Sequence, residues 1–219
     1  MTIAAAGAAM MGGANAATFY LGGNGGDLGK DQVFTDGSAS VTAIAINTEE
    51  PDAPVLHQNV FGLGVYSGES DDGILSGGNQ VDNIGDDEAI VLDFGAAATL
   101  ESITLSVASS WDDIRIYGSN NAAVAAITSG GLSSITSIST LLASTTGTGI
   151  EGFKTIDLSG IATAYRYLIA TIPGGSGDGF RVKWVSASVS EVPVPAALPL
   201  LLSGLAGLGF ASRRKKAAA

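Results

Sequence analysis

The sequence predicts an all-β fold, an antiparallel β-sandwich with jelly-roll topology, followed by a C-terminal single transmembrane helix. Three observations support this prediction. Short apolar runs in the middle of the chain are separated by Gly, Asn, Asp and Ser, as strands joined by turns are. Several of these runs alternate polar with apolar residues, which is typical of strands with one wet face. The chain ends in an uncharged apolar segment closed by basic residues, which is the pattern of a membrane span.

The composition suits one domain with a targeting segment at each end. The chain has 219 residues, of which 14% are charged, and it contains no cysteine, so disulfides are excluded. Four of the ten basic residues form the C-terminal tail. The rest of the chain, the body, holds the other six and all 21 acidic residues, so its net charge is −15. A body of that sign repels nucleic acid and anionic lipid. A solvated acidic surface, a bound divalent cation and a basic partner all remain compatible with it.

Residues 1–17 are predicted to be a signal peptide. The N-terminus is apolar and uncharged up to Asp27, and Ala14 and Ala16 flank Asn15 in the small-x-small pattern that signal peptidase recognises, with cleavage before Ala17. A basic start is absent, so this segment is expected to be the second part of a signal peptide whose Met1 is an internal residue. A plain disordered terminus is the alternative.

Residues 18–190 are predicted to form the sandwich. In the run that starts at Leu100, Ile103 and Leu105 face one side of the strand and Thr104 the other. The alternation of the last strand slips near Val185, which suggests a bulge. About nine strands with turn-rich links indicate a sandwich. The predicted strands are Ser40–Asn47, Val60–Tyr66, Ala89–Phe94, Leu100–Ala108, Asp113–Tyr117, Ser139–Ser144, Phe153–Leu158, Tyr165–Ile172 and Arg181–Val189.

Two stretches between these strands have patterns other than alternation. Residues 121–131 form a candidate short helix that ends at Gly130, and residues 133–139 suit either a strand or a loop. The end of the domain, residues 172–189, is a strand, a Gly-rich turn and a final strand. In this it resembles discoidin-like and galactose-binding-like sandwiches, and the resemblance implies the jelly-roll topology.

Residues 191–219 are predicted to be a sorting segment with three parts. A proline motif spans 192–196, an apolar helix spans 196–212, and a basic tail spans 213–216. The 17 residues of the apolar run are at the lower limit for crossing a bilayer. The tail of Arg213, Arg214, Lys215 and Lys216 is expected to stay in the cytoplasm, so that the body lies outside.

The three parts together resemble the PEP-CTERM family of sorting signals, and most closely its Val-Pro-Leu-Pro-Ala (VPLPA) variant. Val192, Pro193, Pro195 and Ala196 match that motif, and Val194 stands where Leu is usual. The resemblance implies processing by an exosortase near the proline motif, in Gram-negative bacteria that make exopolysaccharide and biofilm. It also implies export across the inner membrane, anchoring by the C-terminal helix before processing, and then a place at the cell surface or in the extracellular matrix. A helix kept as a permanent anchor is the alternative.

The acidic stretch from Glu69 to Asp93 is the candidate metal site. It holds eight carboxylates with no Lys or Arg, and such a group is unfavourable unless water or a cation screens it. Calcium, which binds hard oxygen ligands, is the candidate ion. Exposed acidic loops are the alternative. The candidate ligands are Asp71, Asp72, Asp82, Asp86, Asp87 and Glu88.

Aromatic residues beside acidic ones make a second candidate, a sugar-binding surface. Asp112, Asp113 and Asp178 are its candidate acidic partners. Core packing is the alternative for the rings, above all for Trp184, which alternates with core positions and is expected to be buried. The candidate rings are Tyr66, Trp111, Tyr117 and Trp184.

Catalytic motifs are scarce. His57 is the single histidine and is expected in a solvated loop near Pro51 and Pro54. No G-x-S-x-G motif occurs, and the turn GGSGDG lacks the lysine of a phosphate loop. The sequence therefore predicts a non-enzymatic surface or matrix protein. A carbohydrate-binding module of the same fold and a carboxylate-dependent glycoside hydrolase are the alternatives.

Overall fold

The computed structural model describes one compact unit, Ala14–Ser190. Within it the described residues are 14–47, 54–66, 80–82, 87–107, 113–127, 130–146, 152–173 and 179–190. The strand β1 (Ala14–Tyr20) begins inside the segment predicted to be a signal peptide. The proline motif, the apolar helix and the basic tail predicted for residues 191–219 lie outside the described residues.

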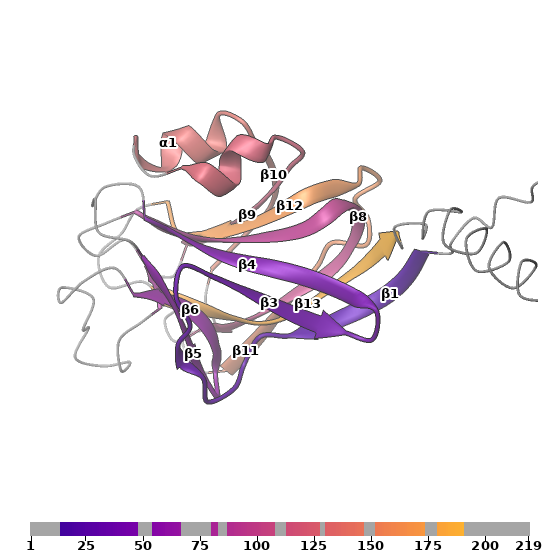
Figure 1. Ribbon diagram of the computed structural model, residues 1–219. Coiled ribbons are helices and arrows are strands. Elements are labelled where there is room, and N and C mark those ends of the chain that lie inside the picture. The colour runs from indigo at the N-terminus through magenta and orange to yellow at the C-terminus, as the bar shows by residue number, and fades with distance from the viewer. Residues whose placement is uncertain are drawn as a thin grey trace, which may run out of the picture. The chain divides into compact units, whose positions relative to one another are not determined.

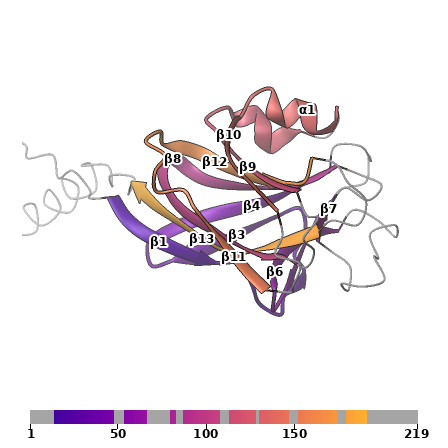
Figure 2. The ribbon, with the colours of Figure 1, turned by 180° about the vertical axis from the view of Figure 1, so that it is seen from behind.

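The strands form two layers, which lie one above the other in Figure 1 and, from behind, in Figure 2. All strand pairs of the first layer are antiparallel. In spatial order the first layer consists of β10 (Thr140–Thr146), β9 (Asp113–Ser119), β12 (Tyr165–Thr171), the first half of β8 (Glu88–Val107), β4 (Ala39–Asn47) and β3 (Asp31–Asp36).

The second layer is also antiparallel and is built around β13 (Gly179–Ser190). One edge of β13 pairs with the second half of β8, which in turn pairs with β11 (Gly152–Asp157). The other edge pairs with three strands along its length, β1, β6 (Gly62–Tyr66) and β7 (Val81–Asp82). Two short strands complete the layer, β5 (Val55–Asn59) beside β6 and β2 (Gly26–Asp27) beside β5.

The 20-residue strand β8 belongs to both layers, where the sequence predicts two separate strands. Its first half pairs with β4 and β12, and its second half pairs with β13 and β11. Gly95 lies between the halves with φ of +75°, a conformation that disfavours side chains. The Gly95 amide donates to Asp93 Oδ1 at 2.8 Å, which holds the bend. One continuous strand therefore ties the two layers together.

The core lies between the layers and is formed by inward side chains of both. Phe19, Leu100, Ile103, Leu168 and Val185 are among its fully covered members. Each such side chain contributes about 1.5–3 kcal/mol by leaving water. The all-β antiparallel sandwich predicted from alternation is confirmed, and the jelly-roll topology stays a prediction.

A bidentate ion pair spans an irregularity in the pairing of β8 with β12. Tyr165 pairs with Ala98 and Tyr167 with Asp93, so residues 94–97 of β8 are extra and lie opposite Arg166 alone. Arg166 Nε and Nη2 donate to the Asp93 carboxylate at 2.8 and 2.9 Å. Burial of Asp93 raises its pKa, but the hydrogen bonds from Arg166 and Gly95 outweigh that effect and lower the pKa of Asp93 below its usual value.

Two short helices cover the outer face of the first layer. The 3₁₀ helix η2 (Ala122–Ala126) is capped by Asn121, whose side chain accepts from Ala123 N at 3.0 Å. The helix α1 (Gly131–Thr136) buries Leu132 and Ile135 against the sheet. Among the described residues, no helix is long and apolar enough to cross a membrane.

The predictions for this region need correction. Within the predicted helix over 121–131, the structure describes the 3₁₀ helix Ala122–Ala126. Gly130, predicted as a helix end, is the N-cap of α1 with φ of 94°. Residues 133–139, predicted as strand or loop, include most of α1, because Ile135 at helical spacing from Leu132 packs on the sheet.

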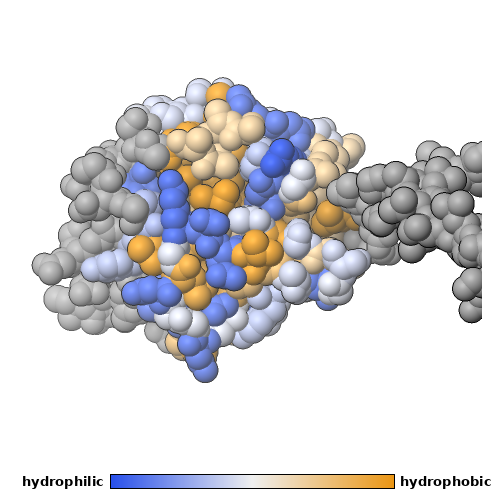
Figure 3. Space-filling view, viewed as in Figure 1, coloured by the Kyte–Doolittle hydropathy of each residue, from blue (hydrophilic) through white to orange (hydrophobic). Residues whose placement is uncertain are grey.

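On the face seen in Figure 3, hydrophilic and hydrophobic residues are interspersed.

Candidate functional site

A β-bulge on β13 places two neighbouring side chains on the same outer face. Val182 pairs with Leu105 and Trp184 pairs with Thr104, so Lys183 is an extra residue in the ladder. Val182 and Val185 both point into the core and are fully covered. Lys183 and Trp184 therefore both face outward, and this is the bulge suggested by the slip in the sequence pattern.

Three aromatic rings meet on this outer face, and we call Tyr20, Phe153 and Trp184 the aromatic platform. Tyr20 comes from β1 and pairs directly with Trp184. The ring centroids of Tyr20 and Trp184 are 5.8 Å apart, and those of Phe153 and Trp184 are 5.5 Å apart. Tyr20 and Phe153 remain 49% and 53% exposed. Exposed rings gathered from three strands are typical of a binding surface.

The ammonium group of Lys183 lies among these rings. Its Nζ is 4.8 Å from the ring centre of Tyr20, 5.4 Å from that of Trp184 and 5.5 Å from that of Phe153. It donates to Tyr20 Oη at 3.1 Å and to the carbonyl oxygen of Val60. Lys183 is only 5% exposed, so the rings cover a desolvated cation. Such cation–π contacts are worth about 2 kcal/mol each and hold the rings in place.

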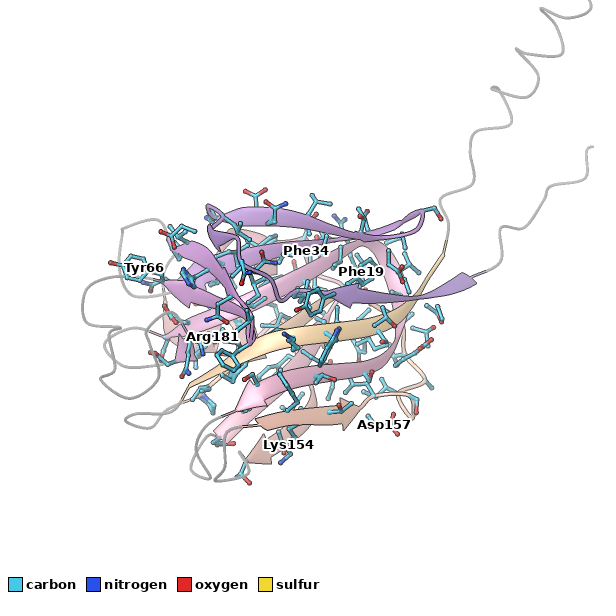
Figure 4. All side chains as sticks on the ribbon, turned by 90° about the horizontal axis from the view of Figure 1, so that it is seen from below. Phe19, Phe34, Tyr66, Lys154, Asp157 and Arg181 are labelled. Atoms are coloured by element: carbon cyan, nitrogen blue, oxygen red, sulfur yellow. The ribbon has the colours of Figure 1, made fainter. Side chains whose placement is uncertain are left out.

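A row of polar side chains runs beside the aromatic platform. Thr18, Ser186, Ser102 and Asp157 face one another across β1, β13, β8 and β11, two residues along the strands from the row that contains Tyr20 and Trp184. Thr18 and Ser186 share a hydrogen bond of 2.8 Å between their hydroxyl groups. The four strands lie side by side in Figure 4, where Asp157 is labelled at one end of β11.

Carboxylates near this row are held by hydrogen bonds from the protein. Glu101 Oε1 accepts from the Ser188 hydroxyl at 2.7 Å, and Asp36 Oδ2 accepts from the Thr18 amide at 2.8 Å. Asp157 Oδ1 accepts from the Ser159 amide at 2.9 Å. Hydrogen bonds from the side chain and backbone of Ser159 lower the pKa of Asp157. Aromatic rings beside oriented hydroxyl and carboxylate groups can hold a ligand that has both an apolar face and polar edges.

The predicted aromatic residues lie in different places. Trp184 is partly exposed, so the expectation that it is buried is wrong, and the bulge is the reason. Tyr117 is 5% exposed and packs under the helices of the first layer, which excludes it from a sugar-binding surface. Tyr66 is the last residue of β6 and is partly exposed. It is labelled in Figure 4. Trp111 lies outside the described residues.

Asp113 and His57, the described members of the predicted acidic partners and the histidine, are not part of the aromatic platform. Asp112 and Asp178 lie outside the described residues, and Asp113 pairs with Arg115 at 3.1 Å on β9. His57 lies within β5 rather than in a solvated loop, and its Nδ1 is 2.8 Å from Asp27 Oδ1.

The predicted metal ligands are only partly described. Asp82 and Glu88 are both buried, and the Asp82 amide donates to Glu88 Oε2 at 3.2 Å. Asp87 Oδ2 accepts from the Leu132 amide at 3.2 Å. Asp71, Asp72 and Asp86 lie outside the described residues. In the part of the chain that the structure describes, no three His, Cys, Asp or Glu residues form a group that could hold a metal.

The predicted signal-peptidase site lies on an ordered strand. Ala14 and Ala16 belong to β1 and pair with Ser190 and Ser188 of β13. Val192, Pro193, Val194, Pro195 and Ala196, like the basic tail from Arg213 to Lys216, lie outside the described residues.

Comparisons with known proteins give structural likenesses only. No family model matches the sequence, and no curated protein matches it. A mutant of the carbohydrate-binding module CBM29-2 is 10% identical over 80% of this chain and 92% of its own, with a TM-score of 0.36. The family 32 module of NanJ from C. perfringens, solved with galactose, is 15% identical over 67% of this chain and 93% of its own, with a TM-score of 0.34. A fucolectin from striped bass (Morone saxatilis) serum is 11% identical over 67% of this chain and 45% of its own, with a TM-score of 0.38. Because these TM-scores lie below 0.5, they do not define a shared fold or site.

Proposed function

We propose that this chain is an exported, non-catalytic surface or matrix protein whose sandwich binds polysaccharide through the aromatic platform. The observation that carries the proposal is the gathering of Tyr20, Phe153 and Trp184 on one outer sheet face. A pyranose ring has an apolar face of C–H groups and an edge of hydroxyl groups. The aromatic rings match the first, and the neighbouring polar row matches the second.

Charge supports this class of ligand over nucleic acid. The body has a net charge of −15, which repels a phosphate backbone. The two cations placed on this face, Lys183 and Arg181, are only 5% and 4% exposed. The proposed role is binding without catalysis. Asp157, Glu101 and Asp36 lie on a sheet surface, and each already accepts a hydrogen bond from the protein.

Binding is tested with exopolysaccharide from the organism that makes the protein, by affinity electrophoresis and titration calorimetry. We expect Trp184→Ala to weaken binding about tenfold, which corresponds to about 1.4 kcal/mol and is the scale of one lost aromatic contact. Leu141→Ala is the matched control, since Leu141 is 51% exposed on β10 of the other layer. Equal affinity of both variants and the unmodified protein would refute a role for the platform.

The sorting part of the proposal rests on the C-terminal sequence pattern. This part includes export and exosortase processing near Pro193 and Pro195. It also includes anchoring by residues 196–212 before release to the surface, and a link to biofilm. The jelly-roll topology belongs to the proposal as well, since the strand, Gly-rich turn and final strand of residues 172–189 support it.

Intact-mass measurement of the protein recovered from cells tests both processing sites. We expect an N-terminus at or near Ala17 and loss of the segment after the proline motif. Replacing Pro193 and Pro195 with Ala is expected to leave that segment attached. Pro173→Ala is the control, because Pro173 lies in the body just after β12. Full-length protein in the cytoplasm would contradict the sorting proposal.

A further inference from the structure

The three rings of the aromatic platform do not lie in one plane. Tyr20 is inclined by 40° to Trp184, and Phe153 by 59°. A crystalline polymer presents its sugars as a flat sheet, which cannot contact three rings inclined in this way. A single chain turns from one sugar to the next, so successive sugars can each meet a ring.

The order of the strands sets the direction of such a chain. The rings come from β1, β13 and β11, with β8 between the last two, as the side-by-side strands in Figure 4 show. Trp184 leans over β8, because its centroid is only 5.5 Å from that of Phe153 two strands away. Thr104 of β8 is accordingly 9% exposed. The line from Tyr20 through Trp184 to Phe153 therefore crosses the strands.

The polar row runs in the same direction. Thr18, Ser186, Ser102 and Asp157 lie across the same four strands, two residues along from the Tyr20–Trp184 row. Two residues of a strand correspond to about 6.6 Å. Phe153 pairs with Ser106 and is four residues from Asp157 on β11, so the row is nearest to Tyr20 and Trp184. A sugar stacked on these two rings therefore brings one edge of its hydroxyl groups toward the row.

The accessible charges on this face are negative. Asp157 is exposed, and Glu101 is partly exposed near the polar row. The cations are covered: Lys183 lies beneath the rings, and burial lowers the pKa of Arg181, which is 4% exposed. Carboxylates accept hydrogen bonds from sugar hydroxyl groups but repel the carboxylates of uronic acids.

On the basis of the proposed function, we infer that the aromatic platform binds a single neutral polysaccharide chain that crosses the strands from Tyr20 to Phe153. The inclined rings select a free chain over a crystalline surface, and the exposed carboxylates select neutral sugars over uronic acids.

The inference is tested on the full sandwich with three kinds of probe. The first is a set of soluble neutral polymers (galactomannan, xyloglucan, dextran and hydroxyethyl cellulose) with their oligosaccharides from one to six sugars. The second is alginate and polygalacturonate, and the third is crystalline cellulose and chitin. We expect at least one neutral polymer to bind ten times more tightly than either acidic polymer at low salt, with affinity rising along its oligosaccharide series. We expect little binding to the crystals.

A substitution and a change of salt test the role of the carboxylate separately from that of the rings. Asp157→Asn is expected to reduce the preference for neutral over acidic chains, because it removes a repelling charge and leaves the rings intact. High salt is expected to act in the same direction by screening. Tighter binding to an acidic polymer or to crystals, lost in Trp184→Ala, would overturn the inference and leave the proposed function standing. Absence of binding to every probe and to the host exopolysaccharide would overturn the proposed function itself.

Discussion

Replacing Lys183 with Met tests whether a buried cation supports the aromatic platform. Met keeps much of the length of the side chain and its apolar stem, and it removes the ammonium group. The variant loses the hydrogen bonds to the Val60 carbonyl and to Tyr20 Oη. It also loses ring contacts at 4.8, 5.4 and 5.5 Å.

The size of the effect follows from opposing contributions. A hydrogen bond from a charged donor contributes about 1.5–3 kcal/mol. The cation–π contacts add about 2 kcal/mol each when desolvated, but burying an ammonium group costs several kcal/mol. If the ring contacts and the burial cost cancel, the loss of the two hydrogen bonds leaves about 3–6 kcal/mol. For a domain of this size that lowers the melting temperature by at least about 6 °C.

The assay is thermal unfolding by circular dichroism, with glycan affinity measured in parallel. Lys154→Met is the matched control, since the ammonium of Lys154 donates to the Thr146 carbonyl and its side chain is partly exposed. We expect the control to melt within about 2 °C of the unmodified protein, as surface substitutions do, and to bind glycan normally. If Lys183→Met melts and binds like the control, the rings need no cation beneath them and the reasoning is wrong.

Three further predictions concern other parts of the sandwich. Gly22→Ala is expected to weaken glycan binding with little change in the core, because a Cβ at Gly22 would lie 2.7 Å from Lys183 Nζ; calorimetry measures this, and unchanged affinity counts against it. The lowered pKa of Asp93 means that its ion pair with Arg166 stabilises the fold above the unfolded pKa of about 3.9 and is lost as pH falls through the lower folded value. The stability difference between the unmodified protein and Asp93→Asn, measured by urea unfolding, is therefore expected to shrink below about pH 4, and a constant difference contradicts the assignment. Ile135→Ala is expected to cost about 2–5 kcal/mol in the same assay, because Ile135 is fully buried between α1 and the first layer; a loss below about 1 kcal/mol would mean that α1 packs loosely.

Alternation of polar and apolar residues was enough to predict most of the sandwich. Leu100–Ala108 and Ala89–Phe94 were predicted as two strands because Gly95 and the alanines after it interrupt the pattern. The structure keeps the chain extended through Gly95, whose positive φ bends the strand without ending it. Local sequence shows where a strand is interrupted. It does not show whether pairing with neighbouring strands in the two layers will keep the chain extended there.

The binding surface was harder to predict, because its members are far apart in the sequence. Tyr20 and Phe153 meet Trp184 only through the pairing of β1, β13, β8 and β11. The slip near Val185 was visible, and counting both residues before it as outward-facing would have moved Trp184 from the core to the surface. A lysine beside a tryptophan at such a slip is the signal that the sequence offered.

The pairing of β1 with β13 also has a mechanical consequence. Trp184 lies in the middle of β13, and the strand continues to Ser190, where the chain leaves the compact unit. A pull between a glycan held at Trp184 and the chain beyond Ser190 acts along β13. It loads the hydrogen bonds to β1 and β8 in shear, so that many must break together. Peeling β1 away from β13, from Ala17 and Ala187 onward, instead opens the same ladder one pair at a time. This sandwich is therefore expected to resist tension on its ligand better than tension between its own two ends.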